Sequence, residues 1–418
     1  MFQNKKWICV FPVWLLYVAL HGQVSIRTNQ ILASARHDLP VELNQKHLDF
    51  IGQTNQNIPL VDQISLRTET DRFLVYRQEY LARMTVNGPS EIRRQRFLNK
   101  AELQTEQNFQ LRLEHEALVA RYEAVSAYRF IQKRIAIQQE LKLVYEDKVN
   151  VFNKLASLNA GTEVDELLKA EYDLDELNLE IDQAMEESDQ IKKLIAGWMS
   201  LQVDQWKMDA TAFIPPSGMQ LVIDQLSMAP NLNPVILEKQ SKIEELQAEY
   251  YFEKASASQM LDFFQLRYAN RPDETLARKF SAGFGINLPF KGSSRVKLAE
   301  LQIDKNNEEQ FLQVEINQLN QEIQSARDQL KALGERYRTA EDQWKESQNK
   351  FSLEHPSLLQ ADGPMTLLKA REYQIKRQVK LVDLEKAISD QYVKILDLTG
   401  ALSSIPLINY FSDQLENY

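Results

Sequence analysis

Histidine and cysteine, the side chains that most often serve as metal ligands or nucleophiles, are few and scattered in this sequence. None of them stands in a Cys–His, paired-His or HExxH spacing, which zinc or nucleophile chemistry would need. The glycines of GFG at 283–285 fit an alternating strand better than a phosphate-binding loop. The sequence therefore predicts no catalytic residue, no metal site and no cofactor, and we do not expect an enzyme. The residues concerned are His21, His37, His47, His115, His355 and Cys9.

The overall composition suits long helices and argues against a nucleic-acid partner. Glycine is scarce, at 12 of 418 residues, and 26% of the residues are charged, which favours helices over a compact sheet protein. The net charge of −10 lacks the basic excess that a surface following phosphates requires. Trp198 and Trp344 fall on helical seven-residue spacings, and we expect them in the core rather than at a ligand.

The N-terminus is typical of a secretory signal peptide. A basic pair beginning at Lys5 precedes an apolar run over residues 7–20, and small or polar residues follow. We therefore predict a signal peptide over 1–22. The alternative is a retained membrane anchor, which the short run and Pro12 both disfavour. Because Cys9 is the only cysteine, the exported chain would have no disulfide.

Long helices are expected wherever proline and glycine are missing. No proline occurs between Pro89 and Pro215, and Gly161 is the one turn signal inside that stretch. Apolar residues recur every seven positions, as in a coiled coil. The sequence predicts helical hairpins over about 91–209 and 294–400, with tips near Gly161 and Gly363. The clearest series are Leu312, Leu319, Ala326, Leu333 and Ala340, and Ile316, Ile323, Leu330, Tyr337 and Trp344.

The two hairpins look like copies of each other. The tetrapeptide LLKA occurs at 167–170 and again at 367–370. Other short matches follow in the same order at separations of about 200 residues, which is the signature of an internal repeat. We therefore divide the chain into a first structural repeat at 23–209 and a second at 210–418. The other matches pair 40–43 with 234–237, 100–103 with 298–301, 153–154 with 349–350, and Gly197 with Gly400.

Ahead of each hairpin the hydrophobic period changes to two. Strands are expected over about 261–290 and, less clearly because of their charge, over about 62–87. Apolar residues on one face with small or polar residues on the other are typical of a strand between lipid and water, although an ordinary half-buried hairpin is the alternative. Four strands cannot close a barrel, so other copies of the chain would have to complete it. The lipid-facing candidates are Phe264, Leu266, Tyr268, Phe280, Phe284, Ile286, Leu288 and Phe290.

This ordered set of features resembles the TolC-type outer-membrane efflux channels. The similar segments include GTEVDELLKAEYDL at the first tip and SAGFGINLPFKGSSRVKLAELQ in the second repeat. The resemblance implies a mainly α fold, with duplicated helical hairpins in an α-barrel and four strands per chain in a trimeric twelve-stranded β-barrel. It also implies a homotrimer in outer-membrane lipid of a Gram-negative cell, with a periplasmic adaptor and an inner-membrane pump of the RND or ABC class as partners.

The tips are where the resemblance places docking and gating, and there the sequence departs from the family. Acidic residues line the entrance of family members just after the second tip, whereas Thr366 and Lys369 stand at the matching positions. We expect Lys369 to face acids of the neighbouring hairpin. A periplasmic coiled-coil adaptor or scaffold is the alternative function. The candidate tip residues are Gly161, Asp165, Glu166, Lys169, Asp362, Gly363, Thr366 and Lys369.

Overall fold

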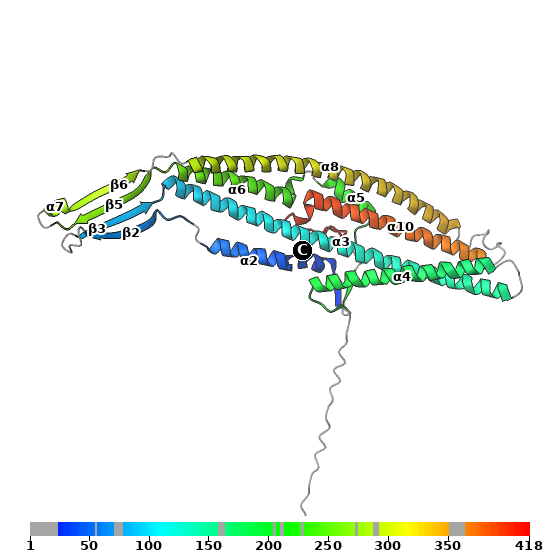
Figure 1. The fold of residues 1–418 in the computed structure, drawn as a ribbon. Coiled ribbons are helices and arrows are strands. Elements are labelled where there is room, and N and C mark those ends of the chain that lie inside the picture. The colour runs from blue at the N-terminus through cyan, green and yellow to red at the C-terminus, as the bar shows by residue number, and fades with distance from the viewer. Residues whose placement is uncertain are drawn as a thin grey trace, which may run out of the picture.

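The protein is an elongated, curved body of long helices with a small sheet at one end (Figure 1). This computed structural model describes ten segments of the chain. The predicted signal peptide lies outside them, as do Gly161, Asp362, Gly363, Leu288 and Phe290. The described segments are 24–54, 57–70, 78–157, 164–203, 206–209, 213–226, 230–271, 275–286, 292–350 and 364–418.

Four long helices form the body, as the sequence predicts. They are α3 (Pro89–Ser157), α4 (Val164–Trp198), α8 (Gly292–Lys350) and α10 (Pro364–Thr399). Pro89 and Pro364 are the first residues of α3 and α10, where a missing N–H costs nothing. With 69 residues, α3 extends about 100 Å at 1.5 Å per residue.

Shorter elements give the two halves the same order. The first half runs β1 (Val24–Arg27), α1 (Thr28–Ala33), η1 (Ser34–His37), α2 (Leu39–Gln53), β2 (Val61–Thr70), β3 (Gln78–Val86), then α3 and α4. The second runs β4 (Trp206–Asp209), α5 (Pro216–Gln225), η5 (Pro230–Leu232), α6 (Pro234–Ala257), β5 (Leu261–Ala269), β6 (Phe280–Ile286), then α8 and α10. The turn helices α7 (Leu276–Lys279) and η6 (Ala401–Ser403) stand apart from this order.

One boundary differs from the sequence-based prediction. The first hairpin does not reach residue 209, because α4 ends at Trp198 and Trp206–Asp209 forms strand β4. This strand pairs in parallel with β1, Val24 opposite Trp206 and Arg27 opposite Asp209. The element order therefore supports a second repeat that starts with β4 at Trp206 rather than at 210.

The long helices lie side by side in a single layer. No other helix in the described part of the chain covers the two edges of this layer. Helix α3 packs against α2, α4, α6 and α10, and α8 packs against α6 and α10. Near the sheet the order across the layer is therefore α2, α3, α6, α8, and towards the far end it is α4, α3, α10, α8 (Figure 1). Helices α2 and α4 lie along one edge of the chain, and α8 lies along the other.

The main core lies at mid-length, where β1, β4, α1, α5 and the C-terminal segment surround the long helices. Tyr122, Ile236 and Tyr392 are fully buried there. Much of the predicted seven-residue pattern faces this core, since Leu319, Ile323, Ala326 and Leu330 are all buried. As predicted, Trp198 packs against the core, and the Arg121 guanidinium lies 4.4 Å from its ring centroid. A second cluster, around Val144 and Ile375, fills the body nearer the hairpin ends.

The sheet is antiparallel and has the strand order β2-β3-β5-β6. The two halves of the chain each contribute one strand pair, and β3 joins β5 at the centre. Bulges occur at equivalent positions, next to Asp62 and Asp262. No helix in the described part of the chain is both long and apolar enough to cross a membrane.

Candidate functional site

The strand register gathers the described lipid-facing candidates, all of them except Leu288 and Phe290, on one side of the sheet. Tyr268 is opposite Phe280, and Phe264 is opposite Phe284. Leu66, from the first strand pair, is opposite Ala82, which in turn is opposite Leu266. Both strand pairs therefore contribute to a single apolar face. Its large side chains are exposed: Ile64 66%, Leu66 82%, Tyr80 49%, Phe264 46%, Leu266 61%, Phe280 57%, Phe284 66% and Ile286 58%.

The charges of the first strand pair lie on the opposite face. Arg67, Glu69 and Arg83 alternate with the apolar residues, as do Gln265 and Arg267 of β5. The charge density that weakened the sequence prediction for 62–87 is thus confined to one side. The sheet has one apolar and one polar face along all four strands, as a strand between lipid and water requires.

The outer edges of the sheet are open in a single chain. Among the described strands, β2 and β6 each pair with one neighbour only. Their outward N–H and C=O groups are a template for pairing with another strand. Such edges cannot remain open in a hydrocarbon environment, where every backbone polar group needs a partner.

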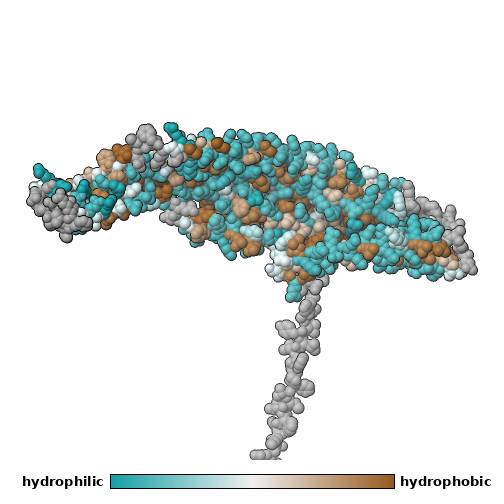
Figure 2. Space-filling model, in the orientation of Figure 1, coloured by the Kyte–Doolittle hydropathy of each residue, from teal (hydrophilic) through white to brown (hydrophobic). Residues whose placement is uncertain are grey.

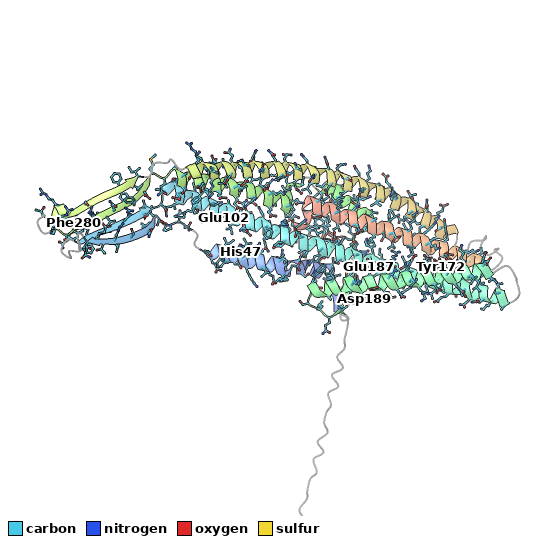
Figure 3. The ribbon with its side chains drawn as sticks, in the orientation of Figure 1. His47, Glu102, Tyr172, Glu187, Asp189 and Phe280 are labelled. Atoms are coloured by element: carbon cyan, nitrogen blue, oxygen red, sulfur yellow. The ribbon has the colours of Figure 1, made fainter. Side chains whose placement is uncertain are left out.

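At the far end of the body the five tip candidates that the structure describes are exposed. Asp165 and Glu166 lie in the first turn of α4, and Lys169 lies one turn further. Thr366 and Lys369 are exposed on the corresponding turns of α10. Within the described part of one chain Lys369 forms no ion pair, so the expected contact with a neighbouring hairpin remains a prediction. Tyr172 and Phe280 mark the two ends of the molecule in Figure 3.

A carboxylate that the sequence reasoning missed joins the two hairpins close to the tips. Glu372 of α10 forms an ion pair with Lys148 of α3 and a second, at 2.8 Å, with Lys376. The Tyr145 hydroxyl donates to Glu372 over 3.1 Å. Burial by itself raises the pKa of Glu372, but hydrogen bonds from the two lysines outweigh it and hold that pKa below its usual value. The group is therefore a charged, partly buried cross-link.

Glu385 makes a similar link further from the tips. It accepts from Lys133 Nζ of α3 over 2.6 Å and from the Tyr337 hydroxyl of α8 over 3.2 Å. Nearby, the Arg129 guanidinium lies 3.6 Å from the Phe213 ring centroid, and burial lowers the pKa of Arg129 to about 10. Glu385 thus ties α10 to both of the helices beside it.

Polar contacts continue along the seam between α3 and α10. Ser126 and Ser389 share a buried hydrogen bond of 2.8 Å, and His115 Nε2 lies 2.8 Å from Asp397 Oδ1. With the Lys133–Glu385 and Lys148–Glu372 pairs, these contacts form what we call the polar seam. Its partners are more than 200 residues apart in the chain, and no local spacing in the sequence indicates them.

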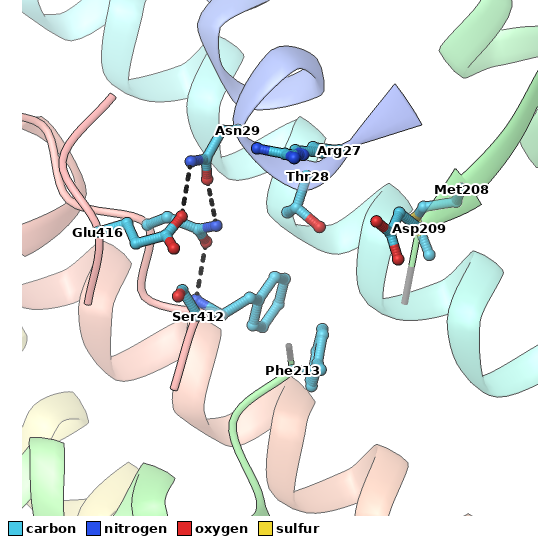
Figure 4. Close-up of a pocket in the computed structure, with 10 residues that line it drawn as sticks. Arg27, Thr28, Asn29, Met208, Asp209, Phe213, Ser412 and Glu416 are labelled. Atoms are coloured by element: carbon cyan, nitrogen blue, oxygen red, sulfur yellow. Dashed lines mark hydrogen bonds between the residues drawn. The ribbon is translucent and has the colours of Figure 1, made fainter. Parts of the chain in front are cut away.

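A cavity of about 270 Å³ lies at mid-length between β1, β4 and the C-terminal segment (Figure 4). Three of its polar side chains bind one another, since Asn29 donates to Glu416 over 3.1 Å and accepts from Asn409. Phe213 stacks on Phe411 at its wall, with centroids 4.4 Å apart. Because these groups satisfy each other, we assign the cavity a structural role. Among the described residues no cluster of three or more His, Cys, Asp or Glu could hold a metal ion.

The solved structures that this chain resembles include several outer-membrane channels. The chain matches the outer-membrane channel OprN with a TM-score of 0.64 and 15% identity, over 89% of each chain. It matches VceC of Vibrio cholerae with a TM-score of 0.63 and 12% identity, over 89% of this chain and 96% of that one. For CmeC of Campylobacter jejuni the TM-score is 0.62 and the identity 13%, over 89% and 85%. No family model matches the sequence, and the search of curated proteins found no similar sequence.

Long paired helices carrying an amphipathic four-stranded sheet define a class of fold. The chain has the fold of the TolC-type outer-membrane channels. This finding confirms the predicted fold class, with long helices and four antiparallel strands in each chain.

Proposed function

We propose that the chain is one subunit of a homotrimeric outer-membrane channel that exports solutes from the periplasm. The observation that carries the proposal is the four-stranded sheet, with one apolar face, one polar face and two open edges. Pairing β6 of one copy with β2 of the next closes the edges. Three copies give twelve strands, with the apolar face against lipid and the polar face around water.

The helical body supports the same assembly. On the face shown in Figure 2 it is mainly hydrophilic, with hydrophobic patches that include one over α2. The exposed apolar side chains of the two edge helices recur at helical spacings, and a second copy of the chain would bury them. They are Leu39, Leu43 and Phe50 on α2, and Val296, Ile303, Phe311 and Val314 on α8.

The hairpin ends, farthest from the sheet, are our candidate for docking a periplasmic adaptor and, through it, an inner-membrane pump of the RND or ABC class. Single cysteines at Asp165 and Thr366, placed in a Cys9→Ser background, should crosslink to a co-expressed adaptor. Reaction of these cysteines with a membrane-impermeant thiol reagent added outside intact cells would contradict the orientation.

Oligomeric state and extraction behaviour test the proposal. The protein should leave the membrane only with detergent, and native mass measurement in detergent should give a trimer. A monomer in detergent would contradict the channel. Release without detergent would favour the alternative, a periplasmic coiled-coil scaffold, which has no need of an exposed apolar sheet face.

A further inference from the structure

The polar face of the sheet contains a layered group of side chains centred on Arg83. The Arg83 guanidinium lies 3.9 Å from the centroid of the Phe263 ring, and its Nη2 donates to Gln265 over 3.3 Å. On the other side of β5, Phe263 is opposite Gly285 and Gln265 is opposite Gly283. A Cβ at Gly285 would lie only 2.2 Å from the Phe263 ring. The glycine therefore lets the ring lie close to the sheet and support the guanidinium.

Arg83 forms no ion pair with an acidic side chain in the described part of the chain. Its Nε is buried and has no hydrogen-bond partner there, so the terminal nitrogens are the ones that can contact a solute. The glutamates on this face are engaged elsewhere: Glu69 with Arg67 at 2.8 Å, and Glu79 with Arg267. Asp62 and Asp262 lie at the bulges, outside the alternating register, and form no ion pair with Arg83.

In the alternating register this face therefore has three arginines (Arg67, Arg83, Arg267) against two glutamates, an excess of one positive charge per chain, although the chain as a whole carries a net charge of −10. The terminal N–H groups of a guanidinium bind carboxylate, phosphate or sulfonate oxygens, and a ring beneath it holds it in place. In a closed trimer three copies of Arg83 would lie at one level of the barrel wall and face water.

We infer that this face recognises anions, and that Arg83, supported by Phe263 and Gly285, is the residue that contacts anionic solutes on their way out. The inference rests on the proposed channel function. It assigns the cargo a chemical class, solutes that carry a carboxylate, phosphate or sulfonate group. It also assigns the sheet a part in selecting them.

A measurement of the local electrostatic potential at position 65 tests the inference, because Ser65 is directly opposite Arg83 in the strand register. In a Cys9→Ser, Ser65→Cys trimer, the rates of modification by an anionic and a cationic methanethiosulfonate reagent of similar size are compared. The Arg83 charge at this distance should raise the modification rate of the anionic reagent about fivefold relative to that of the cationic one, and Arg83→Gln should remove this difference. Arg278→Gln, the same charge change on α7 outside the sheet, should leave the ratio unchanged.

The outcomes separate the inference from the proposed function. A trimer whose rate ratio is the same before and after the Arg83→Gln change would overturn anion recognition while leaving the channel intact. A protein that is monomeric in detergent would overturn both. In planar bilayers Arg83→Gln should also shift the chloride-to-potassium permeability ratio towards potassium. Phe263→Leu, which removes only the support, should lower the rate ratio less than Arg83→Gln does.

Discussion

At the scale of single residues, loss of the Glu372 carboxylate should destabilise the hairpins near their tips. Its partner Lys148 has only 11% of its side chain exposed, so Glu372→Gln leaves a nearly buried ammonium without its counter-charge. Removing one member of a buried pair costs about 3 kcal/mol. We expect that loss in the free energy of unfolding, and faster hydrogen exchange in α3 and α10 near the tips. Asp390→Asn, which breaks the exposed pair with Lys386, should cost less than about 1 kcal/mol.

The same ion pair predicts a pH dependence. The pKa of Glu372 in the folded protein is below its ordinary value of 4.5, so its contribution to stability is fully present above pH 4.5. The contribution is lost as the pH falls through the lowered pKa. The stability difference between the wild type and Glu372→Gln should therefore shrink on acidification. A difference that stays constant from neutral pH to about pH 3 would show that Glu372 acts through packing rather than charge.

Lys369 is exposed and forms no ion pair within the described part of one chain, which leaves its charge available to a neighbouring subunit. If acids of that subunit hold the entrance closed through Lys369, Lys369→Glu should raise single-channel conductance and shift ion preference towards cations. Lys169→Glu makes the same change at the matching turn of the first hairpin. Equal changes in conductance and ion preference would mean that both hairpins contribute to the gate. If neither variant changed them, the gate would lie elsewhere.

At the scale of elements, two glycines that match in the repeats should behave in opposite ways. Gly400 ends α10 in the left-handed region at φ 72°, and a Cβ there would lie 2.5 Å from the Leu232 carbonyl oxygen. Gly197 lies within α4, and a Cβ added to it would meet nothing within 4 Å. Gly400→Ala should lower the unfolding free energy by at least about 2 kcal/mol. Gly197→Ala should be neutral or stabilising by up to about 1 kcal/mol. Denaturant unfolding in detergent measures both.

The sequence could predict the elements whose pattern is long. The absence of proline from 90 to 214 and the seven-residue series predicted α3, α4, α8 and α10, and period-two alternation predicted the strands. Strands β1 and β4 were missed because four residues are too few to show a period, and their pairing joins segments about 180 residues apart. The polar seam could not be predicted for a related reason. In the sequence Glu372 looks like any exposed acidic residue of a helix, and only the fold places Lys148 beside it.

At the scale of the whole molecule, a chain of contacts shows which parts of the two edges lie at the same height. Asn44 of α2 donates to Gln110 of α3, and Asn108 of α3 donates to the Leu237 carbonyl of α6. Lys239 of α6 then pairs with Glu315 of α8. The middle of α2 is therefore level with α8 near residue 315, on the opposite edge of the chain.

The exposed apolar residues of the two edges match at that height. Helix α2 runs towards the sheet and α8 runs away from it (Figure 1). An antiparallel alignment of the two helices therefore brings Phe50 level with Phe311, and Val314 is the exposed apolar residue of α8 nearest in height to Leu43. Each pair of residues is exposed in one chain and would be covered when two copies meet side by side. The two edges of the chain are thus complementary in position and in chemistry, as a ring of identical subunits requires.

A disulfide between these edges is the sharpest test of the assembly. In a Cys9→Ser background, Phe50→Cys with Phe311→Cys should form disulfides between subunits under mild oxidation. Because each subunit has both edges, non-reducing gels should show crosslinked dimers and trimers. No product larger than a trimer should form, because a ring of three subunits is closed. Phe50→Cys with Val296→Cys is the matched control, because Val296 lies 15 residues nearer the sheet than Phe311, about 22 Å away along α8. The control pair should stay reduced. A ladder that continues beyond trimers, or crosslinking that is equal in both variants, would contradict a closed ring built on these edges.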